Sequence, residues 1–297
     1  MMPDIHNLEI HVAHACNLAC ESCAHYSNHG HKGLVSLEEA DEWMAPWSGR
    51  IAPKFFSLLG GEPTVHPELT QFARIARRHW PLSTLRIVTN GFFLHRHPEL
   101  PAFIRDDGRA ILNISVHHDS PEYRERLRPV LELAERWTRE YGVPIQMFAS
   151  KDGWTRRYKG YGAAMEPYDD RLPRASWEAC AAKTCPQIFE GSIWKCAPLA
   201  YLGMQDKRFG LSGRWTPYLG YRPLQPGCTD EELRAFFARE EESHCAMCAA
   251  KPERFDLPHP DPRRLTCLTP SKRRASGCGN SARPIGTPTR ACPPTKR

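Results

Sequence analysis

The 297-residue sequence contains no run of eighteen apolar residues, so no part of it reads as a transmembrane helix. Its first twelve residues also lack the basic stretch and apolar core of a secretory signal. We therefore expect a cytoplasmic protein with no membrane partner. Because that compartment is reducing, we expect its twelve cysteines to serve metal or redox chemistry rather than a disulfide framework.

Acidic residues are scarce at the C-terminal end. Residues 251–297 carry eleven Lys and Arg against three Asp and Glu, a balance of +8 within a net charge of +6, so residues 1–250 sum to −2. Residues 268–297 have no acidic or aromatic residue, five prolines and seven basic residues. Such a segment buries too little apolar surface to offset its ordering entropy, which predicts a disordered, solvated tail. Nucleic-acid binding is the alternative for a basic tail, and we do not expect it.

Strand and helix patterns alternate through the first 150 residues. Apolar residues alternate over residues 8–14, and residues 36–47 begin with a capping box, Ser36 and Glu39, and continue with helical spacing. Further strands are predicted at 54–61, 84–91, 110–118 and 143–150, and helices at 66–80, 98–106 and 121–142. Alternating β and α elements indicate an α/β fold with parallel strands and crossover helices.

Four predicted strand ends carry residues suited to chemistry. They are the cysteine loop at 16–23, GGEP at 60–63, TNG at 89–91 and SVHH at 115–118. The C-terminal ends of parallel strands lie on one side of a sheet or barrel, where active sites form. We therefore expect these four segments to converge.

The cysteine loop supplies three thiols, Cys16, Cys20 and Cys23, with no fourth beside them. Thiolates bind soft metals and iron–sulfur clusters, and a closed structural zinc site needs four ligands. Three thiols suit a cubane cluster with one iron open to a small chelating ligand. A zinc site completed by His14 or His25 is an alternative. Inert buried thiols are another, disfavoured by the polar residues between the cysteines.

The triad, followed by GGEP at the next strand end, resembles the radical S-adenosylmethionine (SAM) superfamily over residues 6–150. The resemblance implies a partial (β/α)6 barrel with a small C-terminal iron–sulfur module and the disordered basic tail. We place the domains at 1–175, 176–267 and 268–297. It further implies a [4Fe-4S] cluster on the three cysteines, SAM chelated to its open iron, and hydrogen abstraction by a 5′-deoxyadenosyl radical. An electron donor such as flavodoxin or ferredoxin is implied as a partner.

The same resemblance assigns SAM-binding residues one by one. Gly60 and Gly61 would let the backbone approach the methionine moiety. Glu62 would accept a hydrogen bond from its amino group. Asn90 and Ser115 would face the ribose.

One position departs from the family. An aromatic residue often precedes the third cysteine, near the adenine, but here the residue is Ser22. Tyr26 is the candidate substitute.

Cysteines return after residue 175, at Cys180, Cys185, Cys196, Cys228, Cys245 and Cys248. The spacing of the first and third of these around Gly191, with a later CAMC, resembles the twitch and SPASM modules of the superfamily. A full SPASM module has more closing cysteines, so we predict one auxiliary [4Fe-4S] cluster. Zinc is the alternative, because CxxC also serves zinc ribbons. Residues 188–196 predict a hairpin that turns at Glu190 and Gly191.

The compact layout resembles the epimerases of aminoglycoside biosynthesis. We therefore predict a radical SAM epimerase that inverts a sugar carbon of a small aminosugar, with a thiol returning the hydrogen. On this resemblance Cys248 is the catalytic donor, with Cys245 as its near alternative. The auxiliary ligands are then Cys180, Cys185, Cys196 and Cys245. In the alternative pattern, that of aminocyclitol alcohol dehydrogenases, Cys248 is a ligand and Cys185 is spare.

Two other classes remain open. A peptide-modifying radical enzyme would usually add a peptide-recognition domain, and we see none before the first strand. A non-enzymatic iron–sulfur or zinc protein would have no use for GGEP at the second strand end.

Overall fold

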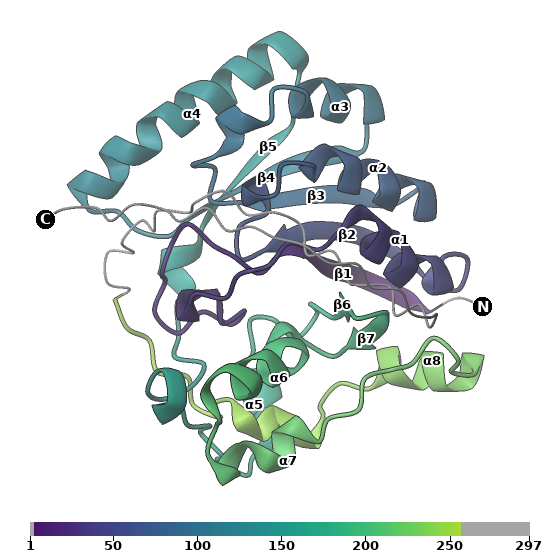
Figure 1. Cartoon of the computed structure of the whole chain (residues 1–297), viewed down its shortest axis with the longest axis vertical. Coiled ribbons are helices and arrows are strands. Elements are labelled where there is room, and N and C mark those ends of the chain that lie inside the picture. Colours follow the sequence, from purple (N-terminus) through teal and green to yellow (C-terminus); the bar gives the residue numbers. More distant parts are fainter. Residues whose placement is uncertain (1–2, 257–297) are drawn as a thin grey trace, which may run out of the picture.

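The structure, a computed structural model, describes residues 3–256, which form one seven-stranded sheet with helices around it (Figure 1). The predicted tail at 268–297 lies outside the described residues. The strands are β1 (Asp4–Ala13), β2 (Ala52–Gly60), β3 (Thr84–Thr89), β4 (Ala110–Val116), β5 (Ile145–Ala149), β6 (Gln187–Phe189) and β7 (Ser192–Trp194). The α-helices are α1 (Leu37–Met44), α2 (Leu69–His79), α3 (Leu100–Asp107), α4 (Pro121–Tyr141), α5 (Pro173–Glu178), α6 (Ala197–Phe209), α7 (Thr216–Leu219) and α8 (Asp230–Ala238).

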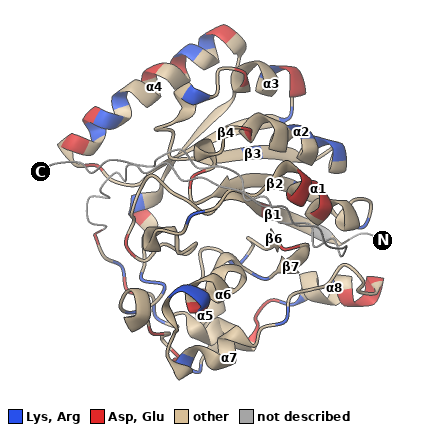
Figure 2. Ribbon diagram, in the orientation of Figure 1, with Lys and Arg blue, Asp and Glu red and all other residues tan. Residues whose placement is uncertain are grey.

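The predicted alternation of strands and helices through residue 150 is confirmed. Helix α1 begins with the predicted capping box, in which Ser36 Oγ accepts from Glu39 N at 3.1 Å and the Glu39 carboxylate accepts from Ser36 N at 3.0 Å. Helix α4 ends at Gly142, whose φ of 70° is the left-handed conformation that glycine adopts without strain. Basic and acidic residues are interleaved along α4, as expected for a helix with one face in solvent (Figure 2).

The sheet order is β5-β4-β3-β2-β1-β6-β7, and β1 to β6 are parallel. The α/β class is therefore confirmed, but the sixth parallel strand lies beside β1 rather than after β5. Strands β6 and β7 form the predicted hairpin, with Glu190 and Gly191 at φ 51° and 75°. The region predicted as a second module from residue 176 therefore contributes two strands to the same sheet.

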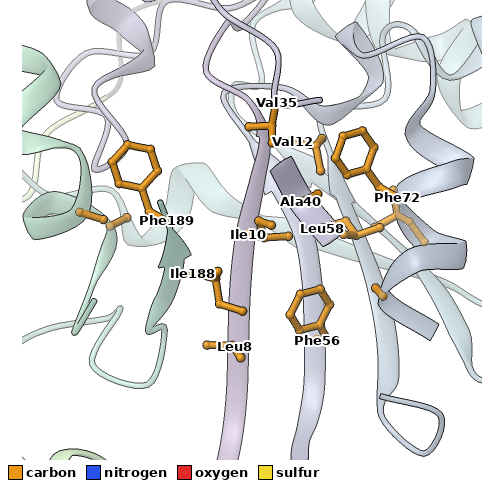
Figure 3. Packing of buried hydrophobic residues seen from close by; sticks show 14 of the residues in the cluster. Leu8, Ile10, Val12, Val35, Ala40, Phe56, Leu58, Phe72, Ile188 and Phe189 are labelled. Atoms are coloured by element: carbon orange, nitrogen blue, oxygen red, sulfur yellow. The ribbon is translucent and has the colours of Figure 1, made fainter. Parts of the chain in front are cut away.

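One face of the sheet is apolar and packs against helices. Leu8, Ile10 and Val12 of β1 lie with Phe56 and Leu58 of β2 in the buried core (Figure 3). Residues of α1 and α2 pack against them, which fixes this as the helix side. Within residues 3–256, no helix is long and apolar enough to cross a membrane.

The opposite face of the sheet, here the inner face, is polar although it is buried. Successive residues of a strand point to opposite faces, so the residues between the apolar ones line it. Asn7, at the centre, accepts from Ser57 Oγ at 3.0 Å and from Arg86 Nη2 at 2.5 Å. Glu9 accepts from Asn7 Nδ2 at 2.7 Å and from Gln187 Nε2 at 2.5 Å. The polar residues of the inner face are Asn7, Glu9, His11, Ser57, Arg86, Asn113, Ser115 and Gln187, and Phe55, Leu59, Val88 and Ile111 lie among them.

Candidate functional site

The cysteine triad lies on the loop that leaves the C-terminal end of β1. None of the three forms a disulfide within residues 3–256, and Cys16 Sγ accepts from Leu18 N at 3.4 Å. Cys20 packs with Leu18 in a small apolar cluster of its own. Burial raises the pKa of Cys16 and of Cys23, and the neighbouring Glu62 and Cys20 raise that of Cys16 further. A bound metal would have to displace these thiol protons.

The two glycines of GGEP hold the triad loop against the end of β2. Gly61 N donates to Ala13 O at 2.7 Å, and Glu62 N donates to Ala15 O at 2.9 Å. A Cβ on Gly60 would lie 2.2 Å from Ala13 O, and one on Gly61 would lie 2.4 Å from Ala15 O. Both contacts are with backbone, so neither position accepts a side chain. Sequence analysis predicted that a methionine moiety would approach these glycines. In the structure the backbone of the triad loop approaches them.

Glu62 is buried, with 1% of its surface exposed, and its carboxylate joins the ends of β2 and β3. Oε1 accepts from the Thr64 backbone N at 3.0 Å, from the Thr64 hydroxyl, and from Thr89 Oγ1 at 2.5 Å. Oε2 accepts from Asn90 N at 2.8 Å. Burial raises the pKa of Glu62 and these donors oppose the rise. Oε2, with a single donor, has a free lone pair for the amino group that sequence analysis assigned to it.

Asn90 is turned toward the triad loop. Its Nδ2 donates to Asn17 Oδ1 at 2.6 Å, and its Oδ1 accepts from Phe92 N at 3.1 Å. Ser115 is half-buried on the inner face near the end of β4. The structure thus brings the ends of β1, β2 and β3 together around Asn90 and Glu62, as predicted for strand ends. The ribose roles of Asn90 and Ser115 stay predictions.

Tyr26 is the residue that sequence analysis proposed for the adenine contact. It is 1% exposed, and its hydroxyl donates to Pro198 O at 3.3 Å at the junction with the second cysteine set. Ser22, at φ 56°, is also buried and accepts from Arg157 N at 2.7 Å. Proximity in sequence suggested the adenine role for Tyr26. The adenine contact of Tyr26 stays a prediction.

Four cysteines of the second set line one pocket, here called the thiol pocket: Cys180, Cys196, Cys245 and Cys248. Its other walls are apolar and cationic, formed by residues such as Pro198, Leu199, Met247, Lys183, Lys195 and Arg157. Burial raises the pKa of Cys196 and Cys245, and raises that of Cys248 to about 12, with neighbouring thiols adding to each rise. Four soft donors in a cation-lined pocket fit an anionic thiolate-bound group.

The remaining two cysteines of the second set lie elsewhere. Cys185 does not line the thiol pocket, and its Sγ accepts from Asn7 Nδ2 at 3.7 Å beside the inner face. Burial and the neighbouring Glu9 raise the pKa of Cys185. Cys228 Sγ accepts from Arg50 Nη2 at 3.7 Å. Within residues 3–256, no three His, Cys, Asp or Glu side chains are grouped as ligands of one metal ion.

Sequence analysis missed two features of this region. The first is Glu9, which reads as a solvent-facing residue of an alternating strand but lies 7% exposed on the inner face. The second is Arg157, in a segment with no periodic pattern. For Glu9, the only signal in the sequence is that polar residues occupy every second position of β1. For Arg157, we find no signal.

The joined strand ends around Glu62 and the three thiols of the triad loop beside them form the arrangement that sequence analysis expected of a radical SAM site. Residues 10–145 match the family model of the Radical SAM superfamily, so the chain carries a radical SAM domain. A [4Fe-4S] cluster and SAM are the cofactors of such a domain. The three triad thiols, the glycine-bounded turn and the lone pair on Glu62 are compatible with both.

Characterised relatives match part of the chain. The GTP 3′,8-cyclase of Yersinia pestis is 28% identical over 116 residues, 38% of this chain and 34% of that protein. The GTP 3′,8-cyclase of Chlorobaculum tepidum is 32% identical over 89 residues, 30% of this chain and 27% of that protein. The chain thus spans about a third of the length of the curated relatives it matches.

Solved structures also show weak similarity to this chain. BtrN in complex with AdoMet and 2-DOIA is 16% identical, with 86% of this chain and 100% of that chain covered and a TM-score of 0.49. The anSMEcpe structure with bound AdoMet is 18% identical, with 48% and 42% covered and a TM-score of 0.38.

Proposed function

We propose that this protein is a radical SAM enzyme that oxidises an alcohol carbon of a small amino-substituted sugar or cyclitol. The observation that carries the proposal is the grouping of Cys180, Cys196, Cys245 and Cys248 around one pocket. That grouping supports the ligand set of the dehydrogenase pattern, in which Cys248 is a ligand and Cys185 is spare.

The thiol pocket supports a second [4Fe-4S] cluster with four protein ligands. Its thiols make no disulfide, and three cationic side chains line it. When bound, the cofactors would supply the radical that removes a hydrogen atom from the substrate and an acceptor for the remaining electron. The alcohol carbon then loses a hydrogen atom, a proton and an electron, and becomes a carbonyl.

The inner face supports a polar, amino-bearing substrate. Its buried side chains offer hydrogen-bonding groups where a substrate would lie beyond the triad loop, and Glu9 is the carboxylate among them. A buried carboxylate is the natural partner of an ammonium group. Asn113 Oδ1 on the same face is buried without a hydrogen-bond partner, an acceptor that a substrate hydroxyl or amine would satisfy.

Epimerisation, the reaction predicted from sequence by resemblance to the neomycin C epimerase, is the second candidate. It needs a thiol that returns a hydrogen atom to the far face of the substrate carbon. Cys185 favours it over Cys248 as that donor, because its thiol contacts Asn7 on the inner face, whereas Cys248 lines the thiol pocket. Return of the hydrogen leaves a thiyl radical, which takes an electron and a proton to regenerate the thiol.

Product analysis of the anaerobically reconstituted protein in D2O tests the two reactions. We expect an oxidised product two mass units lighter than an aminocyclitol or aminosugar substrate. A product of unchanged redox state that carries one deuterium would establish epimerisation instead. Cleavage of SAM without either product, across a panel of amino-substituted sugars and cyclitols, would contradict the substrate class.

Paired cysteine variants test the ligand set. Cys248→Ala should lose the iron of the second site, about half of some eight irons per chain if both groups are cubanes. Cys185→Ala should keep full iron, and Cys228→Ala serves as the matched control outside both regions. Full iron in Cys248→Ala with loss in Cys185→Ala would restore the ligand set expected from sequence. Stoichiometric zinc in place of iron would remove the second cluster.

A further inference from the structure

Segment 154–158 runs along the triad loop and is held to it by several hydrogen bonds. Trp154 Nε1 donates to Glu21 O at 2.8 Å, and Arg157 N donates to Ser22 Oγ at 2.7 Å. Tyr158 follows, with its hydroxyl donating to Asn28 at 3.1 Å. The backbone at Arg157 is therefore held directly beside the residues that precede Cys23.

The side chain of Arg157 extends from this position into the wall of the thiol pocket. Ala24, which follows Cys23 in the triad loop, lines the same pocket. Tyr26 closes the junction through its bond to Pro198, another lining residue. The triad loop and the thiol pocket are therefore neighbours, and Arg157 belongs to the wall between them.

Arg157 differs from the two lysines of the thiol pocket in its bonding. Lys183 Nζ donates to Glu178 O at 3.1 Å, and Lys195 Nζ donates to Phe236 O at 3.3 Å and to Arg239 O. Within residues 3–256, the Arg157 guanidinium makes no hydrogen bond or ion pair. The Arg157 guanidinium is half-buried, and four thiols line the same pocket. An anionic group bound in the pocket would supply the counter-charge that it lacks.

Arg157 lies close to cysteines of both sets. Arg157 lines the thiol pocket together with Cys248, and its backbone N donates to Ser22, the residue before Cys23. A guanidinium stays charged at any working pH, so this positive charge is permanent.

We propose that Arg157 is the positive charge that sets the reduction potential of the cluster in the thiol pocket. The inference rests on the second cluster of the proposed function. One-electron reduction adds a negative charge to a thiolate-bound cluster. A fixed cation in its wall stabilises the reduced form more than the oxidised form, which makes reduction easier.

The test is a redox titration of the anaerobically reconstituted full-length chain, followed by the EPR signal of the reduced cluster. A Cys16→Ala/Cys20→Ala/Cys23→Ala background isolates the second cluster. Arg157→Gln should shift its midpoint potential to a more negative value, and Arg157→Lys should recover most of the shift. Arg156→Gln is the matched control, because the Arg156 charge in the same segment is already paired with Glu21 and Glu253.

Iron content, measured first on every preparation, separates the possible failures. Absence of iron in the triad-free background would remove the second cluster, and with it the basis of the inference. Full iron with an unchanged midpoint in Arg157→Gln, or the same shift in Arg156→Gln, would overturn the role of Arg157 alone. Loss of iron in Arg157→Gln but not in Arg157→Lys would show that the positive charge at residue 157 matters to the cluster, which supports the role of Arg157. Equal loss of iron in both variants would overturn that role.

Discussion

The backbone N–H of Asn90 donates to Oε2 of Glu62 at 2.8 Å, so the ends of β2 and β3 share one buried carboxylate. Thr89 and Thr64 complete the donors around it. A single acidic side chain therefore holds the framework on which the SAM site is built.

Glu62→Gln should weaken SAM binding and also lower the melting temperature. In the variant, an NH2 group replaces one carboxylate oxygen of Glu62 and faces other hydrogen-bond donors. Loss of a charge-assisted hydrogen bond costs about 1.5–3 kcal/mol. Calorimetric binding of SAM and thermal unfolding, both measured anaerobically, check the two effects. Glu68→Gln is the control at an exposed position on the same connection. Unchanged SAM affinity would remove Glu62 from the amino-group site.

Gly61→Ala should displace the triad loop. The new Cβ would lie 2.4 Å from Ala15 O, and overpacking against backbone costs at least about 1–3 kcal/mol. We expect a lower melting temperature and less iron at the first site. Gly203→Ala, inside α6 with open space around it, should be neutral or stabilising by about 0.5–1 kcal/mol. A Gly61→Ala protein with full iron and an unchanged melting temperature would contradict the docking role.

Glu9→Gln should raise KM for an amino-bearing substrate by about tenfold to a hundredfold, the equivalent of a lost charge-assisted hydrogen bond. The KM for the matching hydroxyl analogue should change much less. A general disturbance of the inner face would change both KM values alike. The ratio of the two KM values therefore reports the contact between Glu9 and the ammonium group alone. Equal changes for both substrates would show that Glu9 acts only on the Asn7 and Gln187 network.

Acid should destabilise the protein through His66. Burial lowers the pKa of His66 to about 4, and both ring nitrogens are occupied, Nε2 donating to Val35 O and Nδ1 accepting from Glu68 N. The unfolded state binds the proton near pH 6.5, so this contribution is present above pH 6.5 and is lost as pH falls toward 4. The loss is about 1.4 kcal/mol per pH unit. Urea unfolding between pH 7.5 and 5.5 should be less pH-dependent in His66→Gln, and an identical dependence would refute the assignment.

Local patterns in the sequence predicted most of the first 150 residues. Alternation gave each strand, and the Ser36 capping box and Gly142 marked helix ends that the structure has. These features depend on neighbouring residues only. The partner of β6 could not be predicted in this way, because Gln187 pairs with Glu9 across 178 residues.

The same distinction between local patterns and distant contacts applies to the candidate site. The triad and GGEP were visible because their spacing is local. The choice between Cys185 and Cys248 was not, since both lie near Cys196 or Cys245 in sequence and only the packing of distant segments separates them. Arg157 was invisible for the same reason, because its significance depends on two loops more than twenty residues away.

Strand β1 receives its two neighbours at very different times during synthesis. Strand β2 emerges from the ribosome soon after it, whereas β6 is made only when residue 189 is reached. Until then the nascent β1 presents an open edge, with Glu9 still without its Gln187 donor. The radical SAM portion cannot therefore complete its own sheet. A gene truncated before β6 should yield a chain that depends on chaperones or aggregates, although every residue of the triad and GGEP is present.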